Sequence, residues 1–219
     1  TAVLLTCYNR KDKTLACLTS FFEADLPENY HFDIFLTDDG SSDGTEQVIS
    51  EKFPMVNIIK GNGELFWAGG MRLAWSTALK HDQYDAFLLL NDDVILKKDF
   101  LKNLIEAEQY AIRETGKKGV YSGATFDQSS KKTTYGSSKI RKNHFIVRHD
   151  LLVPQEEPQA CEITNANILW VDMSVVEKIG ILDKRYTHGI ADYDYSLKAY
   201  KKGFPVYLAP NICGICIYD

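Results

Sequence analysis

The chain has 219 residues, enough for one large domain, and its 45% hydrophobic and 25% charged residues are the balance of a soluble globular protein. The net charge of −5 provides no general basic field, which excludes a protein that wraps nucleic acid. No apolar run approaches the roughly 18 residues of a transmembrane helix, and no signal peptide is visible.

Apolar patterning predicts strands and helices that alternate through the first half of the chain. The predicted strands are 2–5, 32–36, 56–59 and 86–90, and the predicted helices are 11–24, one that ends near 52, and 71–80. Asp43 and Glu46 resemble a capping box at the start of the second helix.

In the second half, Asp99 is expected to cap a helix that runs to about 113. Strands at 119–126 and 161–171, a helix at 193–202 and a strand at 204–208 follow. This order predicts a single α/β domain over 1–219, with a mostly parallel open sheet flanked by helices.

The segment 129–158 is polar and has few periodic signals. It carries six basic residues within eighteen positions, namely Lys131, Lys132, Lys139, Arg141, Lys142 and Arg148. Such a run is typical of a solvated surface or a mobile loop. The alternative is a flap that meets an anionic substrate or a membrane surface.

The five cysteines have no framework spacing, which predicts reduced thiols in a cytoplasmic protein. Cys213 and Cys216 form a C-x-x-C motif late in the sequence. A zinc ribbon needs a second such pair, and a thioredoxin motif opens a helix after an early strand. We therefore expect no metal or redox site from this pair.

Polar groups, acids, an aromatic ring and glycines follow the first four predicted strands, where open α/β sheets bind their ligands. They are Thr6, Tyr8 and Arg10, then Asp38 and Asp39, then Trp67, Gly69, Gly70 and Arg72, and finally Asn91, Asp92 and Asp93. Structural roles are also open to them. Asp38 and Asp39 suit an Asx turn and a helix cap, the glycines suit a turn, and Arg10 suits a surface charge.

Asp92 and Asp93 follow three leucines of a buried strand, with only Asn91 between. Two adjacent carboxylates repel each other and are costly to desolvate, so we expect a compensating partner. Hard oxygen ligands favour Mg²⁺ or Mn²⁺, which would in turn hold a substrate phosphate. The chain lacks a G-x-x-x-x-G-K-[ST] phosphate loop, and "GNGELF" fails the dinucleotide pattern.

A second acidic cluster lies at the start of the last predicted helix, in "HGIADYDYSLKAYKKG". One of Asp192 and Asp194 could cap that helix. Two acids beside His188 exceed what a cap needs, and a carboxylate that faces a substrate hydroxyl acts as a general base.

Four segments in order resemble the family 2 glycosyltransferases of the GT-A fold: "TCYNR", "LTDDGSSDGT", "LLLNDDV" and "HGIADYDYSLKAYKKGF". The segments "GELFWAGGMRLAW" and "ADYDYSLKA" are similar to bacterial rhamnosyltransferase-like members that build surface polysaccharide. The resemblance covers nearly the whole chain. It implies a nucleotide-sugar-binding half over 1–96 and an acceptor and catalytic-base half over 97–219.

The resemblance also implies roles for residues of the donor site. Thr6, Tyr8 and Arg10 match positions that embrace the nucleotide base and ribose. Asp39 matches the acid that hydrogen-bonds the pyrimidine ring. Gly69 and Gly70 would lie beside the nucleotide sugar.

The D-x-D position of the family is occupied by Asn91, Asp92 and Asp93. The resemblance implies that Asp93 ligates Mg²⁺ or Mn²⁺, while Asn91 and Asp92 approach the ribose and sugar. Asp192 matches the second acid of the "ED" motif, the catalytic base.

Three positions depart from the family pattern. Asn91 replaces the commoner first acid, Ala191 replaces the usual Glu, and Arg72 stands where many relatives carry Asn. We expect Arg72 to pair with the diphosphate, because a guanidinium matches phosphate oxygens.

Three residues are expected near the acceptor, namely Trp67, His188 and Asp194. Trp67 fits a core position equally well.

The sequence thus predicts a metal-dependent inverting glycosyltransferase that uses a dTDP- or UDP-sugar donor. By the resemblance, its acceptor is a saccharide or lipid-linked sugar at the inner membrane face, which implies peripheral membrane contact. A sugar-nucleotide nucleotidyltransferase is a rival, although "TCYNRKDK" is a poor phosphate loop. A non-catalytic binding subunit is a second rival. The presence of both Asp93 and Asp192 argues against it. The donor sugar, the acceptor, the linkage and the oligomeric state stay open.

Overall fold

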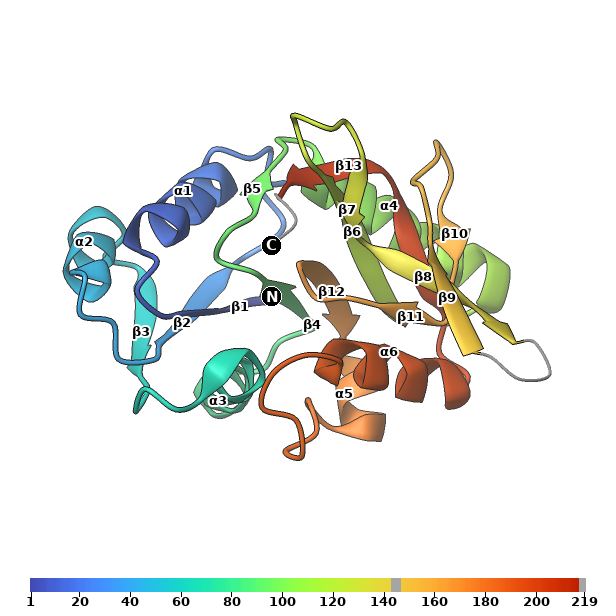
Figure 1. The fold of residues 1–219 in the computed structure, drawn as a ribbon. Coiled ribbons are helices and arrows are strands. Elements are labelled where there is room, and N and C mark those ends of the chain that lie inside the picture. The colour runs from blue at the N-terminus through green and yellow to red at the C-terminus, as the bar shows by residue number, and fades with distance from the viewer. Residues whose placement is uncertain (143–146, 217–219) are drawn as a thin grey trace.

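A computed structural model of the chain describes residues 1–142 and 147–216. Its main sheet has ten strands in the described residues, and eight of them form the order β10-β13-β6-β12-β4-β1-β2-β3 (Figure 1). These strands are β1 (Ala2–Cys7), β2 (Asp33–Asp38), β3 (Val56–Lys60), β4 (Ala86–Leu90), β6 (Val120–Phe126), β10 (Gln159–Ala160), β12 (Ile168–Asp172) and β13 (Val206–Ile215). The short strands β5 (Ile95–Leu96) and β7 (Thr133–Tyr135) pair with β13 and β6.

The sheet is mostly parallel, as predicted. Strands β1, β2, β3 and β4 run parallel to one another, and β13 is parallel to β6. Strand β12 runs antiparallel to both β4 and β6 and joins the two halves of the sheet. Because β1, β2 and β4 share one direction, their carboxyl ends lie at one edge, where the chain turns into polar residues.

Helices cover both faces of the sheet (Figure 1). One buried core contains residues of α1 (Lys11–Phe22), α2 (Thr45–Lys52) and α4 (Phe100–Thr115). The other contains residues of α3 (Phe66–His81), α5 (Met173–Ile179) and α6 (Ala191–Lys201). Each strand alternates between the two cores, so Val3 and Leu5 face the first while Ala2 and Leu4 face the second.

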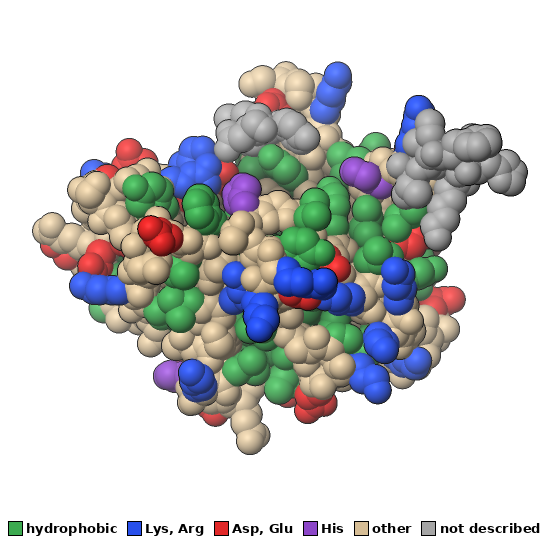
Figure 2. All heavy atoms as spheres, turned by 60° about the horizontal axis from the view of Figure 1, so that its bottom comes forward, with side chains coloured by type: hydrophobic (Ala, Val, Ile, Leu, Met, Phe, Trp, Pro, Cys, Tyr) green, Lys and Arg blue, Asp and Glu red, His purple; other side chains and the backbone are tan. Residues whose placement is uncertain are grey.

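Figure 2 shows the face that α3, α5 and α6 form, with Lys and Arg side chains gathered near its middle beside acidic ones. None of the described helices is both long and apolar enough to cross a membrane.

Helix positions confirm most of the predicted order, but α3 begins at Phe66 and not near residue 71. The Gly-rich stretch that suggested a turn therefore lies inside the helix. The reason is tertiary: the carboxylate of Asp39 accepts hydrogen bonds from the N–H groups of Leu65 (2.8 Å) and Phe66 (3.1 Å), which stabilises the helix start from another strand end.

Two predicted caps are wrong. Asp43 does accept from the N–H of Thr45 at 3.1 Å, but Glu46 forms an ion pair with Lys60 at 2.9 Å and closes no capping box. Asp99 precedes α4 without a side-chain hydrogen bond to it. The helices form nonetheless, because their apolar faces pack on the sheet.

The basic segment is partly strand in the residues that the structure describes, while residues 129–132 and 152–158 lie outside helices and strands, as predicted. Strands β8 (Ser137–Lys142), β9 (Val147–Leu151) and β11 (Ile163–Thr164) form a separate sheet in the order β11-β8-β9. Arg141 lies directly opposite Arg148 in this ladder and pairs with Asp150. Charged residues at alternate positions hid the strand signal, because both faces of a strand pair that covers no large core can be polar. The predicted strand 161–171 divides into β11 and β12.

Candidate active site

The polar strand ends line a cleft made of two connected cavities. The larger one, about 580 Å³, lies over the ends of β1, β2 and β4 and is lined by Thr6, Tyr8, Arg10, Asp39, Asp92 and Asp93, among others. The smaller one, about 300 Å³, contains Asp192 at the start of α6. Five residues line both cavities and form the junction between them: Trp67, Asn91, Tyr135, Asn167 and His188.

Arg10 compensates the acidic pair at the end of β4. Its Nη1 lies 2.9 Å from Asp92 Oδ1, and its Nη2 lies 3.2 Å from Asp93 Oδ2. Thr14 adds a hydrogen bond to the other oxygen of Asp92 at 3.2 Å. The compensating partner expected for Asp92 and Asp93 is therefore the guanidinium of Arg10, at the end of β1. Arg10 is not an isolated surface charge.

The two acids differ in what they can still bind. Asp92 is buried, and burial raises its pKa to about 6 although Arg10 opposes the shift. Arg10 and Thr14 contact both of its oxygens. Asp93 has 13% of its side chain exposed in the cleft, and its Oδ1 has a weak contact from the Cys216 thiol at 3.7 Å.

Asp93 fits a divalent cation better than Asp92 does. Within the described residues, no group of three or more His, Cys, Asp and Glu side chains could hold a metal ion. Mg²⁺ and Mn²⁺ bound to a nucleotide need only one or two carboxylates, since phosphate oxygens and water complete their shell. The single accessible carboxylate of Asp93 meets that requirement.

Both carboxylate oxygens of Asp39 accept hydrogen bonds from the backbone of the segment after β3. Its Oδ1 accepts from the N–H of Gly63 at 2.8 Å, and its Oδ2 accepts from Leu65 and Phe66. Asp38 accepts from the N–H of Ser41 at 2.8 Å, the Asx turn that the sequence allowed. Asp39 nevertheless lines the larger cavity together with Thr6 and Tyr8, and Tyr8 is 55% exposed.

Trp67 orients Asn91 at the junction of the cavities. The indole Nε1 donates to Asn91 Oδ1 at 2.7 Å, and the backbone N–H of Asn91 donates to the carbonyl of Asn167 at 3.0 Å. Trp67 is thus a cleft residue that also packs against the core of the α3 face.

Asp192 lies in the first turn of α6 and faces the smaller cavity. Its oxygens accept from the N–H groups of Ala166 at 3.0 Å and Tyr193 at 2.9 Å. Burial raises the pKa of this carboxyl, while the two N–H donors and the charge of His188 oppose the shift. A carboxylate held rigidly in this way, with a raised pKa, is suited to accept a proton from a hydroxyl in the cavity.

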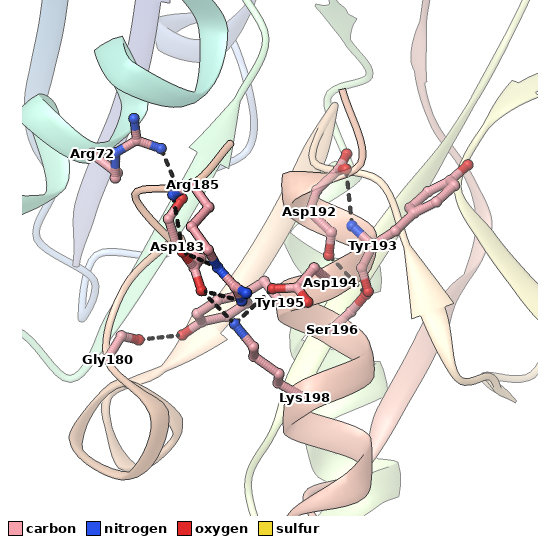
Figure 3. Close-up of polar contacts among 10 residues, drawn as sticks. All are labelled: Arg72, Gly180, Asp183, Arg185, Asp192, Tyr193, Asp194, Tyr195, Ser196 and Lys198. Atoms are coloured by element: carbon pink, nitrogen blue, oxygen red, sulfur yellow. Dashed lines mark hydrogen bonds and ion pairs between the residues drawn. The ribbon is translucent and has the colours of Figure 1, made fainter. Parts of the chain in front are cut away.

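Asp194 points away from the cleft, contrary to the expected acceptor role (Figure 3). Its carboxylate pairs with Lys198 at 2.7 Å, and Lys198 also contacts Asp183 at 3.1 Å. Asp183 in turn holds Arg185 at 2.8 Å. This charge cluster ties the segment 180–190 to α6.

Arg72 holds the same segment from the opposite side, and it lines neither cavity (Figure 3). Its Nη1 donates to the carbonyls of Asp183 at 3.0 Å and Tyr186 at 2.6 Å. The geometry therefore gives this guanidinium a backbone partner in place of the expected diphosphate. The segment it holds carries His188 into the cleft.

Gly69 and Gly70 are buried in α3 and do not line the cleft either. A Cβ on Gly70 would lie 2.0 Å from Thr6 Oγ1, so this glycine allows α3 to approach β1 closely.

Sequence reasoning missed several cleft residues, and four of these have side chains that can form hydrogen bonds: Tyr135, Asn165, Asn167 and Tyr193. Three of them come from β7 and from the stretch before β12, in the part of the chain whose strands were predicted poorly. The signal that could have indicated Asn165 and Asn167 was the presence of two asparagines next to an apolar strand. Both side chains are buried in the structure.

Comparison with known proteins identifies the family. The model of glycosyl transferase family 2 matches residues 2–173. The chain belongs to this family. No curated protein matches it.

Two solved structures share the fold of this family 2 chain. A mannosyltransferase, PcManGT from Pyrobaculum calidifontis in complex with GDP-Man and Mn²⁺, has a TM-score of 0.65 at 16% identity, over 98% of this chain and 55% of its own. TarS of S. aureus, residues 1–349, also has a TM-score of 0.65 at 16% identity, over 98% of this chain and 59% of its own. The chain thus spans little more than half of either structure. The predicted GT-A fold is confirmed.

Proposed function

We propose that this chain transfers a sugar from a nucleoside-diphosphate sugar to a hydroxyl group of a saccharide or lipid-linked acceptor, with inversion at the anomeric carbon. Its donor would be a dTDP- or UDP-sugar, as the rhamnosyltransferase-like segments suggest. Family membership favours this reaction over nucleotidyl transfer.

The observation that carries the proposal is that the two acidic side chains lie in different cavities of the cleft. The accessible carboxylate of Asp93 lies in the larger cavity, and the rigidly held carboxylate of Asp192 lies in the smaller one. Asn91 and Trp67 stand where the two cavities meet. A donor in the first cavity and an acceptor in the second would bring the anomeric carbon and the hydroxyl together at this junction.

Asp192 would take the proton of the acceptor hydroxyl. The hydroxyl oxygen then attacks the anomeric carbon from the side opposite the diphosphate. The bond between that carbon and the diphosphate oxygen breaks, and the nucleoside diphosphate leaves with the electron pair. Because this is one displacement, the anomeric configuration inverts.

Asp93 would hold Mg²⁺ or Mn²⁺ when the nucleotide binds. The cation would neutralise charge on the diphosphate. Residues 1–96 would supply the donor site, and residues 97–219 would supply the base and most of the acceptor site.

Calorimetric titration with UDP, dTDP and GDP, with and without Mn²⁺, tests the donor site. We expect Mn²⁺-dependent binding of UDP or dTDP, and a loss of the Mn²⁺ dependence in Asp93→Asn. Absence of nucleotide binding under both conditions would contradict the proposal and favour a non-catalytic binding subunit.

A further inference from the structure

The side chains that line the smaller cavity are mostly uncharged. Its lining is mostly amide and aromatic: Trp67, Asn91, Tyr135, Asn165, Asn167, His188, Gly189, Ile190, Asp192 and Tyr193. In the described part of the chain, neither Lys nor Arg lines it. The carboxylate of Asp192 is the negative group that any occupant must approach.

Two of the asparagine amides have a defined orientation. Asn91 Oδ1 accepts from the indole N–H of Trp67 at 2.7 Å, and Asn165 Oδ1 accepts from the backbone N–H of Gly136 at 3.1 Å. Both partners are donors only, so in each amide the oxygen must face the protein partner. The NH₂ group of each amide is then the end that remains for a ligand.

The cavity therefore offers hydrogen-bond donors from Asn91 and Asn165 and an acceptor from Asp192. A sugar hydroxyl both donates and accepts, which matches this mixture. The aromatic rings of Trp67 and Tyr193 supply flat apolar surface for the C–H face of a sugar ring. The Tyr193 ring is itself held edge-on against His149, with ring centroids 5.5 Å apart.

An anionic occupant is disfavoured for the same reason. A phosphate or carboxylate near Asp192 would be repelled by its charge. Among the described lining residues only the imidazole of His188 could compensate, and it already faces the charge of Asp192. The described basic residues of the hairpin β8–β9, such as Lys139 and Arg148, do not line the cavity.

We infer that the acceptor subsite beside Asp192 takes a neutral saccharide unit, recognised through the amide donors of Asn165 and Asn91, and rejects a polyol phosphate or sugar phosphate. This inference rests on the proposed function, because it assigns the substrate class of the same site.

Saturation-transfer NMR with methyl glycosides tests the inference. A panel of methyl glucoside, galactoside and rhamnoside is compared with glucose 6-phosphate and glycerol 3-phosphate, on protein loaded with the nucleoside diphosphate that binds best. We expect at least one neutral glycoside to bind, and the phosphates to bind at least fivefold more weakly.

Asn165→Asp is the decisive variant, because the carboxylate still accepts from Gly136 while the NH₂ donor is lost. We expect glycoside affinity to fall at least fivefold, whereas the matched control Asn29→Asp, at an exposed position outside the cleft, leaves it unchanged. If Asn165→Asp unfolds, Tyr193→Ala replaces it, with the same expected loss.

Tighter binding of the phosphates, failure of every glycoside to bind, or unchanged glycoside affinity in the folded variant would overturn the inference. Nucleoside diphosphate affinity is measured on the same samples. It stays at the wild-type value if only the acceptor inference fails, and it is absent from the start if the proposed function fails.

Discussion

Arg10 connects the end of β1 with the end of β4. Its guanidinium bridges Asp92 and Asp93, so it positions the proposed cation ligand Asp93 and favours the ionised form of the buried Asp92. The three side chains form one unit, and removal of one member leaves a charge without its partner.

Arg10→Ala should therefore destabilise the fold by about 2 kcal/mol, less than a fully buried pair would lose, because Arg10 is 35% exposed. Chemical denaturation measures the loss. In an Asp92→Asn background the same substitution should cost clearly less, since the buried charge is gone. An equal loss of unfolding free energy in both backgrounds would show that the Arg10–Asp92 pair contributes nothing to stability.

The raised pKa of Asp192 predicts the pH dependence of transfer. The carboxyl must be ionised to accept a proton, so the rate should fall as the pH falls through its pKa. Since burial raises that pKa, the acidic limb of kcat/KM should lie above the value of about 4 of an ordinary aspartate. The substitution Asp194→Asn, outside the cleft, should leave the pH of this acidic limb unchanged. A limb at or below pH 4 would count against Asp192 as the base.

The segment 180–190, between α5 and α6, is the element that links the two halves of the cleft. Arg72 and the N–H of Ala68 bind its carbonyls from α3, the latter at 3.0 Å from Thr187. Lys198 binds it from α6. A position on this segment, such as that of His188, depends on both anchors.

Arg72→Met should lower kcat about tenfold through misplacement of this segment, and should leave nucleoside diphosphate affinity within twofold. Arg72→Lys should rescue little, because one ammonium does not reproduce the guanidinium fork. Steady-state kinetics and calorimetry separate the two effects. A large loss of nucleotide affinity with intact kcat would instead support the diphosphate contact expected from sequence.

Helix α3 packs closely against β1, whose Thr6 lines the larger cavity. Gly70→Ala should destabilise the protein by about 2 kcal/mol, because the new methyl group overlaps Thr6. Thermal unfolding of Gly70→Ala with and without Thr6→Ala checks the cause, since loss of the hydroxyl should recover part of the stability. Gly189→Ala, where a Cβ meets nothing within 4 Å, is the control. No loss in Gly70→Ala would refute the close approach.

On the scale of the whole molecule, the sequence predicted the sheet and the position of the cleft. Continuous apolar strands and polar strand ends are local patterns, so they placed Asp39, Asn91 and Asp93 at one edge. Asp192 was singled out by its acidic cluster and by the family resemblance. Partners distant in sequence escaped prediction. The Arg10 bridge spans 82 positions and the contact of Arg72 with Asp183 spans 111, and no local pattern encodes such pairs.

Release of nucleoside diphosphate from a nucleotide sugar, in the presence of a neutral glycoside, tests the central claim most directly. The wild-type chain and Asp192→Asn are compared at equal nucleotide occupancy. We predict that the wild type releases the diphosphate with formation of an inverted glycoside, and that the variant is about 10²–10⁴-fold slower at unchanged donor affinity. Equal rates in the two proteins would contradict the assignment of Asp192 as the catalytic base.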